Sequence, residues 1–219
     1  MNVLVIGGGG REHALVKTLS RSKHTKNIHA VPGNSSMTKY ADVHSNINDS
    51  DIERIVELTQ KENITWAVVG PEAPLNAGVA DALEAAGVKV FGPRKLEAQL
   101  ESSKAFAKNI MLKYGIPTAE YQAFTNLIDA SEYIKEQGAP IVIKKDGLAA
   151  GKGVAVAMTE TEALEALREM FVEGENNPVV IEEFLEGEEF SLMVLVNGEY
   201  TLPFDIVAQD HKRAYDGDT

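Results

Sequence analysis

The chain of 219 residues carries 21 basic and 33 acidic side chains, a formal net charge of −12, which disfavours a protein that binds nucleic acid through a basic surface. It contains no cysteine, so disulfides and thiolate metal sites are excluded, and its 44% hydrophobic and 25% charged residues are typical of a globular fold. The sequence has neither an apolar stretch of about 18 residues nor a basic leader segment, so we expect a cytoplasmic protein without membrane association.

The charge is divided unevenly along the chain. Residues 1–100 have 11 basic and 11 acidic side chains, whereas residues 101–219 have 10 basic and 22 acidic ones. The whole acidic excess therefore lies in the second part, and this shift in composition favours two domains.

Short apolar segments alternate with helical patterns through the first hundred residues. Because these segments are continuously apolar, they predict strands of a parallel sheet that is covered on both faces. The sequence therefore predicts an α/β protein whose residues 1–100 form a Rossmann-like domain. The expected strands are residues 2–6, 27–31, 64–69 and 88–91, and the expected helices are residues 11–21, 51–62 and 76–86.

Residues 101–118 are expected to form a connecting helix that Ser102 and Ser103 cap and that runs to about Tyr114. Residues 119–190 predict a small α+β domain, with strands at 121–124, 141–145, 154–158 and 179–184 and helices at 127–137 and 160–171.

The last segment, residues 191–219, predicts a β-hairpin, because Asn197-Gly198 favours a type I′ turn. No helix follows to cover it, and the chain stops at Thr219 in a polar loop. We therefore expect a chain that is cut short within a larger domain, and residues 192–219 that are poorly packed or covered by another molecule.

Two segments follow predicted strands of the first domain. The glycine loop of residues 7–13 departs from the dinucleotide pattern G-x-G-x-x-G, since Glu12 stands where the last glycine belongs and no acidic residue ends the second strand. The loop is therefore a tight turn or a site where Gly9 and Gly10 approach an anion or ribose. Glu72, in G-P-E-A-P-L, is either a helix-start carboxylate or an acceptor for sugar hydroxyls.

The loop K-K-D-G-L-A-A-G-K-G-V, residues 144–154, is the most informative motif. It fails the P-loop pattern, because only three residues separate Gly147 from Gly151 and because Gly153 follows Lys152 where Ser or Thr belongs. Since it joins two strands, it is either a flexible hairpin or a flap over a triphosphate, with Lys144 reaching the phosphates. Neighbouring residues of a strand point to opposite faces, so Lys144 and not Lys145 takes that role.

Five glutamates surround an apolar linker in V-V-I-E-E-F-L-E-G-E-E-F-S, residues 179–191. They form either a solvated charge run or a set of acceptors for the adenine amino group and the ribose hydroxyls. The spacing of Glu182 and Glu189 around Phe184-Leu185 and Gly187 favours a hinge between two domains.

These segments together resemble the ATP-grasp superfamily, and in their order they resemble the glycinamide ribonucleotide synthetase family. The resemblance covers essentially the whole chain and rests on G-G-G-G-R-E-H-A, V-V-G-P-E-A-P-L, S-S-K-A-F-A-K, P-I-V-I-K-K-D-G-L-A-A-G-K-G-V, I-E-E-F-L-E-G-E-E and Q-D-H-K-R. It implies a Rossmann-like domain, an ATP-grasp lid subdomain at 119–190 and the incomplete start of the central ATP-grasp domain at 191–219. It also implies a ligase of purine biosynthesis that joins glycine to 5-phosphoribosylamine with ATP, through a glycyl phosphate.

The same resemblance implies roles for individual residues. For ATP it implies phosphate contacts from Lys104 and Lys144, a flap at Ala150, Gly151, Lys152 and Gly153, an adenine site at Glu182 and the backbone of Glu183 and Leu185, and a ribose contact at Glu189. It makes Lys144 and Lys212 the catalytic lysines and directs Gly9, Gly10 and Glu72 toward phosphoribosylamine. Ligands for Mg²⁺ or Mn²⁺ are expected beyond Thr219, so no metal ligand is assigned and these residues alone are expected not to turn over.

Three alternatives remain open. The chain is also consistent with a fragment that binds nucleotide or phosphoribosylamine without catalysis, or with another ATP-grasp ligase that joins a different carboxylate to an amine. A nicotinamide-dependent oxidoreductase is the least favoured alternative, because the dinucleotide pattern is absent.

Overall fold

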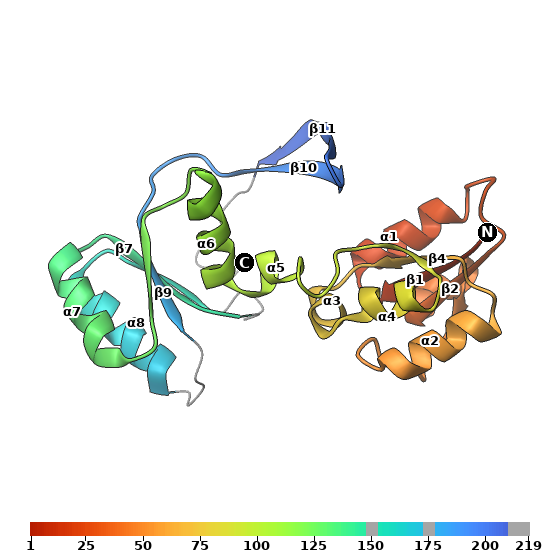
Figure 1. Cartoon of the computed structure of the whole chain (residues 1–219), viewed down its shortest axis with the longest axis horizontal. Helices are drawn as coiled ribbons and strands as arrows, with labels where there is room; N and C mark the ends of the chain where they lie inside the picture. Colours follow the sequence, from red (N-terminus) through yellow and green to blue (C-terminus); the bar gives the residue numbers. More distant parts are fainter. Residues whose placement is uncertain (148–152, 173–177, 210–219) are drawn as a thin grey trace.

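A computed structural model describes residues 1–147, 153–172 and 178–209. The described chain contains a five-stranded sheet, a four-stranded sheet and a two-stranded hairpin. The five-stranded sheet lies at one end of the molecule and the four-stranded sheet at the other (Figure 1).

The first sheet is parallel throughout, as the continuous apolar segments predict, with strand order β3-β2-β1-β4-β5. Its strands are β1 (Asn2–Gly7), β2 (Asn27–Pro32), β3 (Asp42–Val43), β4 (Trp66–Val69) and β5 (Lys89–Phe91). The sequence did not predict β3, because two residues are too few to form an apolar segment. The predicted Rossmann-like arrangement is confirmed.

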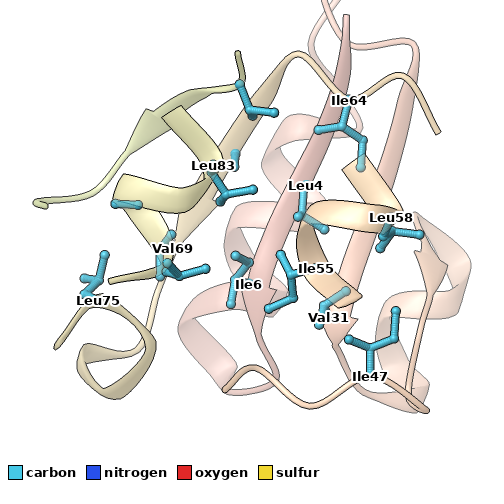
Figure 2. Close-up of a cluster of buried hydrophobic side chains, with 14 of the residues drawn as sticks. Leu4, Ile6, Val31, Ile47, Ile55, Leu58, Ile64, Val69, Leu75 and Leu83 are labelled. Atoms are coloured by element: carbon cyan, nitrogen blue, oxygen red, sulfur yellow. The ribbon is translucent and has the colours of Figure 1, made fainter. Parts of the chain in front are cut away.

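Helices cover both faces of this sheet. They are α1 (Gly10–Leu19), α2 (Ile52–Lys61), α3 (Glu72–Ala77) and α4 (Val79–Ala85), with a short 3-10 helix at Ser35–Lys39. Leu4 and Ile6 of β1 pack on one face with Ile55 of α2 and Leu83 of α4 (Figure 2). Val5, between them, points to the other face, where it packs with residues of α1 and β2.

The single helix predicted at residues 76–86 is wrong. The structure forms α3 and α4 instead, and Gly78 between them has φ 100°. This left-handed conformation, which glycine adopts without the penalty of a Cβ atom, ends one helix and redirects the chain into the next.

Two helices, α5 (Gln99–Ser102) and α6 (Lys104–Tyr114), connect this domain to the second sheet. Ser103 caps α6 as predicted, since its hydroxyl accepts a hydrogen bond from the Phe106 N–H at 3.1 Å.

The second sheet is antiparallel, with strand order β6-β9-β7-β8. Its strands are β6 (Tyr121–Phe124), β7 (Ile141–Lys145), β8 (Val154–Ala157) and β9 (Val179–Glu183), and its helices are α7 (Leu127–Gln137) and α8 (Glu160–Val172). Ile143 and Ile181 are fully buried against residues of both helices. Side chains next to them in sequence, Lys144 and Glu182, therefore point to the opposite face. We call the face that carries Lys144 and Glu182 the open face; α6 lies beside it (Figure 1).

The hairpin consists of β10 (Phe190–Asn197) and β11 (Tyr200–Gln209). Asn197 pairs with Tyr200, so the two turn residues are Gly198 and Glu199, one position later than predicted. Only Gly198 has a positive φ, 60°, which matches a type II′ turn and not the predicted type I′.

The hairpin is poorly packed, as the sequence predicts. Large apolar side chains on both of its strands are exposed, including Val196 at 66%, Leu202 at 62% and Ile206 at 80%. Among the residues that the structure describes, no helix is both long and apolar enough to cross a membrane.

Candidate functional site

The predicted residues of the first domain gather where the parallel strands end. Gly9 and Gly10 follow β1 and begin α1, and Glu72 follows β4 as the first residue of α3. Arg11 joins these loops, because its guanidinium lies 3.5 Å from a carboxylate oxygen of Glu72. Gly9, Gly10, Arg11 and Glu72 are all exposed, so they form a polar rim that a ligand can reach.

Glu12 lies beneath this rim, although the sequence marked it only as a departure from the dinucleotide pattern. Its carboxylate is buried and accepts a hydrogen bond from the Gly9 N–H at 2.7 Å. It also packs directly on Gly70, which leaves no space for a side chain there. Glu12 therefore fixes the glycine loop against the end of β4.

In the second domain, a contact between strands brings two predicted residues together. Lys144 of β7 donates a hydrogen bond to Glu182 of β9 at 2.8 Å. The Glu182 side chain is only 6% exposed and that of Lys144 is 28% exposed. A buried carboxylate is tolerated when cations compensate its charge, so this pair is electrostatically linked.

A second lysine, Lys108 of α6, also contacts Glu182, and the sequence analysis missed it. Its ammonium lies 3.2 Å from the same carboxylate oxygen, and its side chain is 9% exposed. The available signal was its position four residues after Lys104, which places both lysines on one side of the helix.

The start of α6 is attached to the beginning of the glycine loop. Asp146, directly after β7, accepts hydrogen bonds from the Ser103 hydroxyl and from the backbone N–H groups of Lys104 and Ala105. The Lys104 ammonium donates to the Gly147 carbonyl at 3.0 Å. Lys104 therefore lies where the loop leaves the sheet.

The other predicted residues lie around this cluster. The N–H of Glu183 donates to the Glu120 carbonyl at 2.9 Å and is thus engaged within the sheet. Leu185 and Glu189 are exposed in the segment between β9 and β10, and the Gly153 carbonyl accepts from the Lys145 N–H at 2.8 Å. Ala150, Gly151, Lys152 and Lys212 lie outside the described residues.

A cavity of about 550 Å³ lies elsewhere, near the start of β2, lined by residues that include Lys26, Lys39 and Asp42. It shares no residue with either group of predicted residues, so its size does not identify the site. Among the described residues, no three His, Asp or Glu side chains gather in a way that fits a metal ion.

The chain folds into a Rossmann-like domain followed by an antiparallel sheet. The open face of that sheet pairs a lysine with a glutamate beside a glycine-rich loop. This arrangement is typical of the ATP-grasp class. Family models divide the chain in the same order. The N domain of phosphoribosylglycinamide synthetase matches residues 1–101, and its ATP-grasp (A) domain matches residues 102–219. The chain belongs to the phosphoribosylglycinamide synthetase family.

Curated relatives agree with this family. The chain is 52% identical to a phosphoribosylamine–glycine ligase of Streptococcus suis and 50% identical to one of Listeria monocytogenes, and each match covers the whole chain and 53% of the relative. The chain thus spans about half the length of these relatives.

Solved structures support the fold. A phosphoribosylamine–glycine ligase of Thermotoga maritima is 32% identical, with a TM-score of 0.75 over 93% of this chain and 49% of that one. An ADP complex of N5-carboxyaminoimidazole ribonucleotide synthetase is 22% identical, with a TM-score of 0.76 over 98% of this chain and 55% of that one, and shows the shared fold alone.

Proposed function

We propose that this chain serves an ATP-dependent ligase that joins glycine to 5-phosphoribosylamine in purine biosynthesis. In the first step, a glycine carboxylate oxygen attacks the γ-phosphorus of ATP, so that glycyl phosphate forms and ADP leaves. In the second step, the amine attacks the acyl carbon, phosphate leaves, the amine nitrogen releases one proton to phosphate or solvent, and an amide, glycinamide ribonucleotide, results. This metabolic role fits a cytoplasmic location.

The observation that carries this proposal is the contact between Lys144 and Glu182 next to the glycine-rich loop. Phosphoryl transfer depends on cations that neutralise the phosphate oxygens as charge shifts toward the leaving group. Lys144 and Lys104 supply cations at the loop, and the backbone N–H groups of residues 150–153 cover the triphosphate. Lys212 adds a third cation.

We assign the base and the sugar of the nucleotide to the glutamates. Glu182 accepts the adenine amino group, the backbone of Glu183 and Leu185 reads the base edge, and Glu189 accepts the ribose hydroxyls. The apolar side chains of Val154 and Val156, which are 49% and 52% exposed on β8, provide surface for a flat base near Lys144.

The rim of the first domain is our proposed site for phosphoribosylamine. The backbone of Gly9 and Gly10 at the start of α1 suits a phosphate, and the Glu72 carboxylate suits sugar hydroxyls. Arg11 contributes a second cationic group to the same rim.

The resemblance to this class implies Mg²⁺ or Mn²⁺, and we include one of these ions in the proposal. Because the described residues do not gather a ligand set for it, we derive no step through the metal.

The proposal is tested by calorimetric titration of the chain with ATP and with GTP. We expect ATP to bind more tightly than GTP, and Lys144→Met to weaken ATP binding roughly tenfold or more. Lys135→Met, an exposed lysine on α7, is the matched control and is expected to bind as the unmodified chain does. Equal binding by both variants would contradict the proposed site.

The main competing function is an ATP-grasp ligase with a different acid, such as the N5-carboxyaminoimidazole ribonucleotide synthetase whose fold this chain shares. The two differ in the product they bind. Binding of glycinamide ribonucleotide that Glu72→Gln weakens supports the glycine ligase, whereas binding of only a carboxylated imidazole ribonucleotide supports the alternative.

A further inference from the structure

Two lysines share one buried carboxylate on the open face. Lys108 and Lys144 lie 3.2 Å and 2.8 Å from the same oxygen of Glu182, and all three side chains are largely or wholly withdrawn from solvent. One negative charge faces two positive charges, so the cluster carries an excess positive charge where the proposed function places the nucleotide.

The two lysines are held differently. The Lys108 ammonium donates to the Thr118 hydroxyl at 2.7 Å and to the Ala119 carbonyl at 3.0 Å, and it lies 5.4 Å from the centre of the Tyr121 ring. These groups enclose it. Lys144 is more exposed, 28% against 9%, and belongs to the strand that leads into the glycine loop.

We propose that Lys108 is a positioning residue that serves as the permanent counter-ion of Glu182 and thereby releases Lys144 to the phosphates of the nucleotide. This inference rests on the proposed function. When a triphosphate arrives, the Lys144 ammonium moves from Glu182 to the phosphate oxygens. Glu182 keeps Lys108 as its partner, so it stays compensated and fixed in place for the base.

Without Lys108, the same movement would leave a buried carboxylate with no cation beside it. Such an uncompensated charge is strongly unfavourable, so Lys144 would stay with Glu182 and phosphate binding would weaken. Removing the charge of Glu182 as well should free Lys144 again. The two substitutions are therefore expected to be strongly non-additive.

Inorganic tripolyphosphate is the probe, because it contains the phosphates without the base. Calorimetry with the 219-residue chain should show that Lys108→Met weakens tripolyphosphate binding roughly tenfold or more. The double variant Lys108→Met/Glu182→Gln should return to within about threefold of the unmodified chain. Lys113→Met, an exposed lysine on the same helix, is the matched control and should have no effect.

Thermal unfolding of each variant shows whether it is folded. If Lys108→Met does not fold, Lys108→Gln replaces it, since glutamine can still donate to Thr118 and Ala119 while lacking the charge. Unchanged binding in the single variant overturns the proposal, as does a double variant that binds as weakly as the single one. If the unmodified chain binds neither ATP nor tripolyphosphate, or Lys144→Met has no effect, the proposed nucleotide site fails, and this inference fails with it.

Discussion

Replacing Gly70 with alanine should disrupt the glycine loop of the first domain through Glu12. A Cβ atom at residue 70 would lie 2.6 Å from both Cγ and Cδ of Glu12 and closer still to Oε1. Glu12 is buried and cannot simply turn into solvent, so its side chain has to leave the position from which it accepts the Gly9 N–H.

The expected cost has two parts. Forcing an extra carbon atom into a packed site costs about 1–3 kcal/mol. Loss of the buried hydrogen bond between Gly9 and Glu12 adds about 1–2 kcal/mol. Gly70→Ala should therefore lower the free energy of unfolding by about 2–5 kcal/mol.

Urea unfolding followed by circular dichroism measures this loss. Gly10→Ala is the matched control, because a Cβ atom there meets no other atom within 4 Å and alanine favours the first turn of α1. Shortening the neighbour instead, in Glu12→Ala/Gly70→Ala, should recover part of the loss caused by Gly70→Ala alone. Equal stability of Gly70→Ala and Gly10→Ala would refute the reasoning.

Three further predictions concern other parts of the molecule. Asp146→Ala should destabilise the chain by about 1–2 kcal/mol and weaken ATP binding, because the first N–H groups of α6 lose their acceptor. Urea unfolding and calorimetric titration measure the two effects. An unchanged free energy of unfolding and an unchanged affinity for ATP would show that Asp146 does not hold the start of α6 in place. Burial, and then the neighbouring His29, lower the pKa of His44, so near its usual pKa the unfolded chain binds more protons than the folded chain does. The free energy of unfolding should therefore fall as the pH drops below about 6.5. Urea titrations at several pH values should show that His44→Gln flattens this decline. Ile206→Ser on the exposed hairpin should change stability by less than about 0.5 kcal/mol, whereas Ile143→Ser in the buried sheet should cost at least about 2 kcal/mol; similar costs would mean that the hairpin is covered.

Much of the fold is predictable from the sequence because its signals are local. The apolar strands and the cap at Ser103 depend on neighbouring residues, and the structure confirms them. The error at the hairpin turn has a non-local cause. The Asn197-Gly198 pair has the composition of a type I′ turn, but pairing of the two long strands places Gly198 and Glu199 in the turn instead. Strand register, set by contacts between distant residues, overrides the preference of a dipeptide.

The candidate site could be predicted only in part, because its contacts join residues far apart in sequence. Glu182 and Lys144 were both expected near the nucleotide, yet nothing in either segment shows that they touch each other. Lys108 and Glu12 were missed for the same reason. A charged residue looks solvated in a sequence unless its partner is known, and burial of Lys108 becomes understandable only once Glu182 stands beside it.

One helix, α6, contacts both the start of the glycine loop and Glu182 on the open face. Lys104 and Lys108 are four residues apart and therefore share a face of the helix. Lys104 reaches the Gly147 carbonyl where the loop begins, and Lys108 reaches Glu182 on the open face. Asp146, which precedes Gly147 directly after β7, accepts hydrogen bonds from the Ser103 hydroxyl and the Lys104 N–H at the start of α6. Contacts from the first two turns of α6 thus join the helix to the start of the loop and to the sheet, so a substitution at Asp146 disturbs the helix that carries Lys108 as well as the loop.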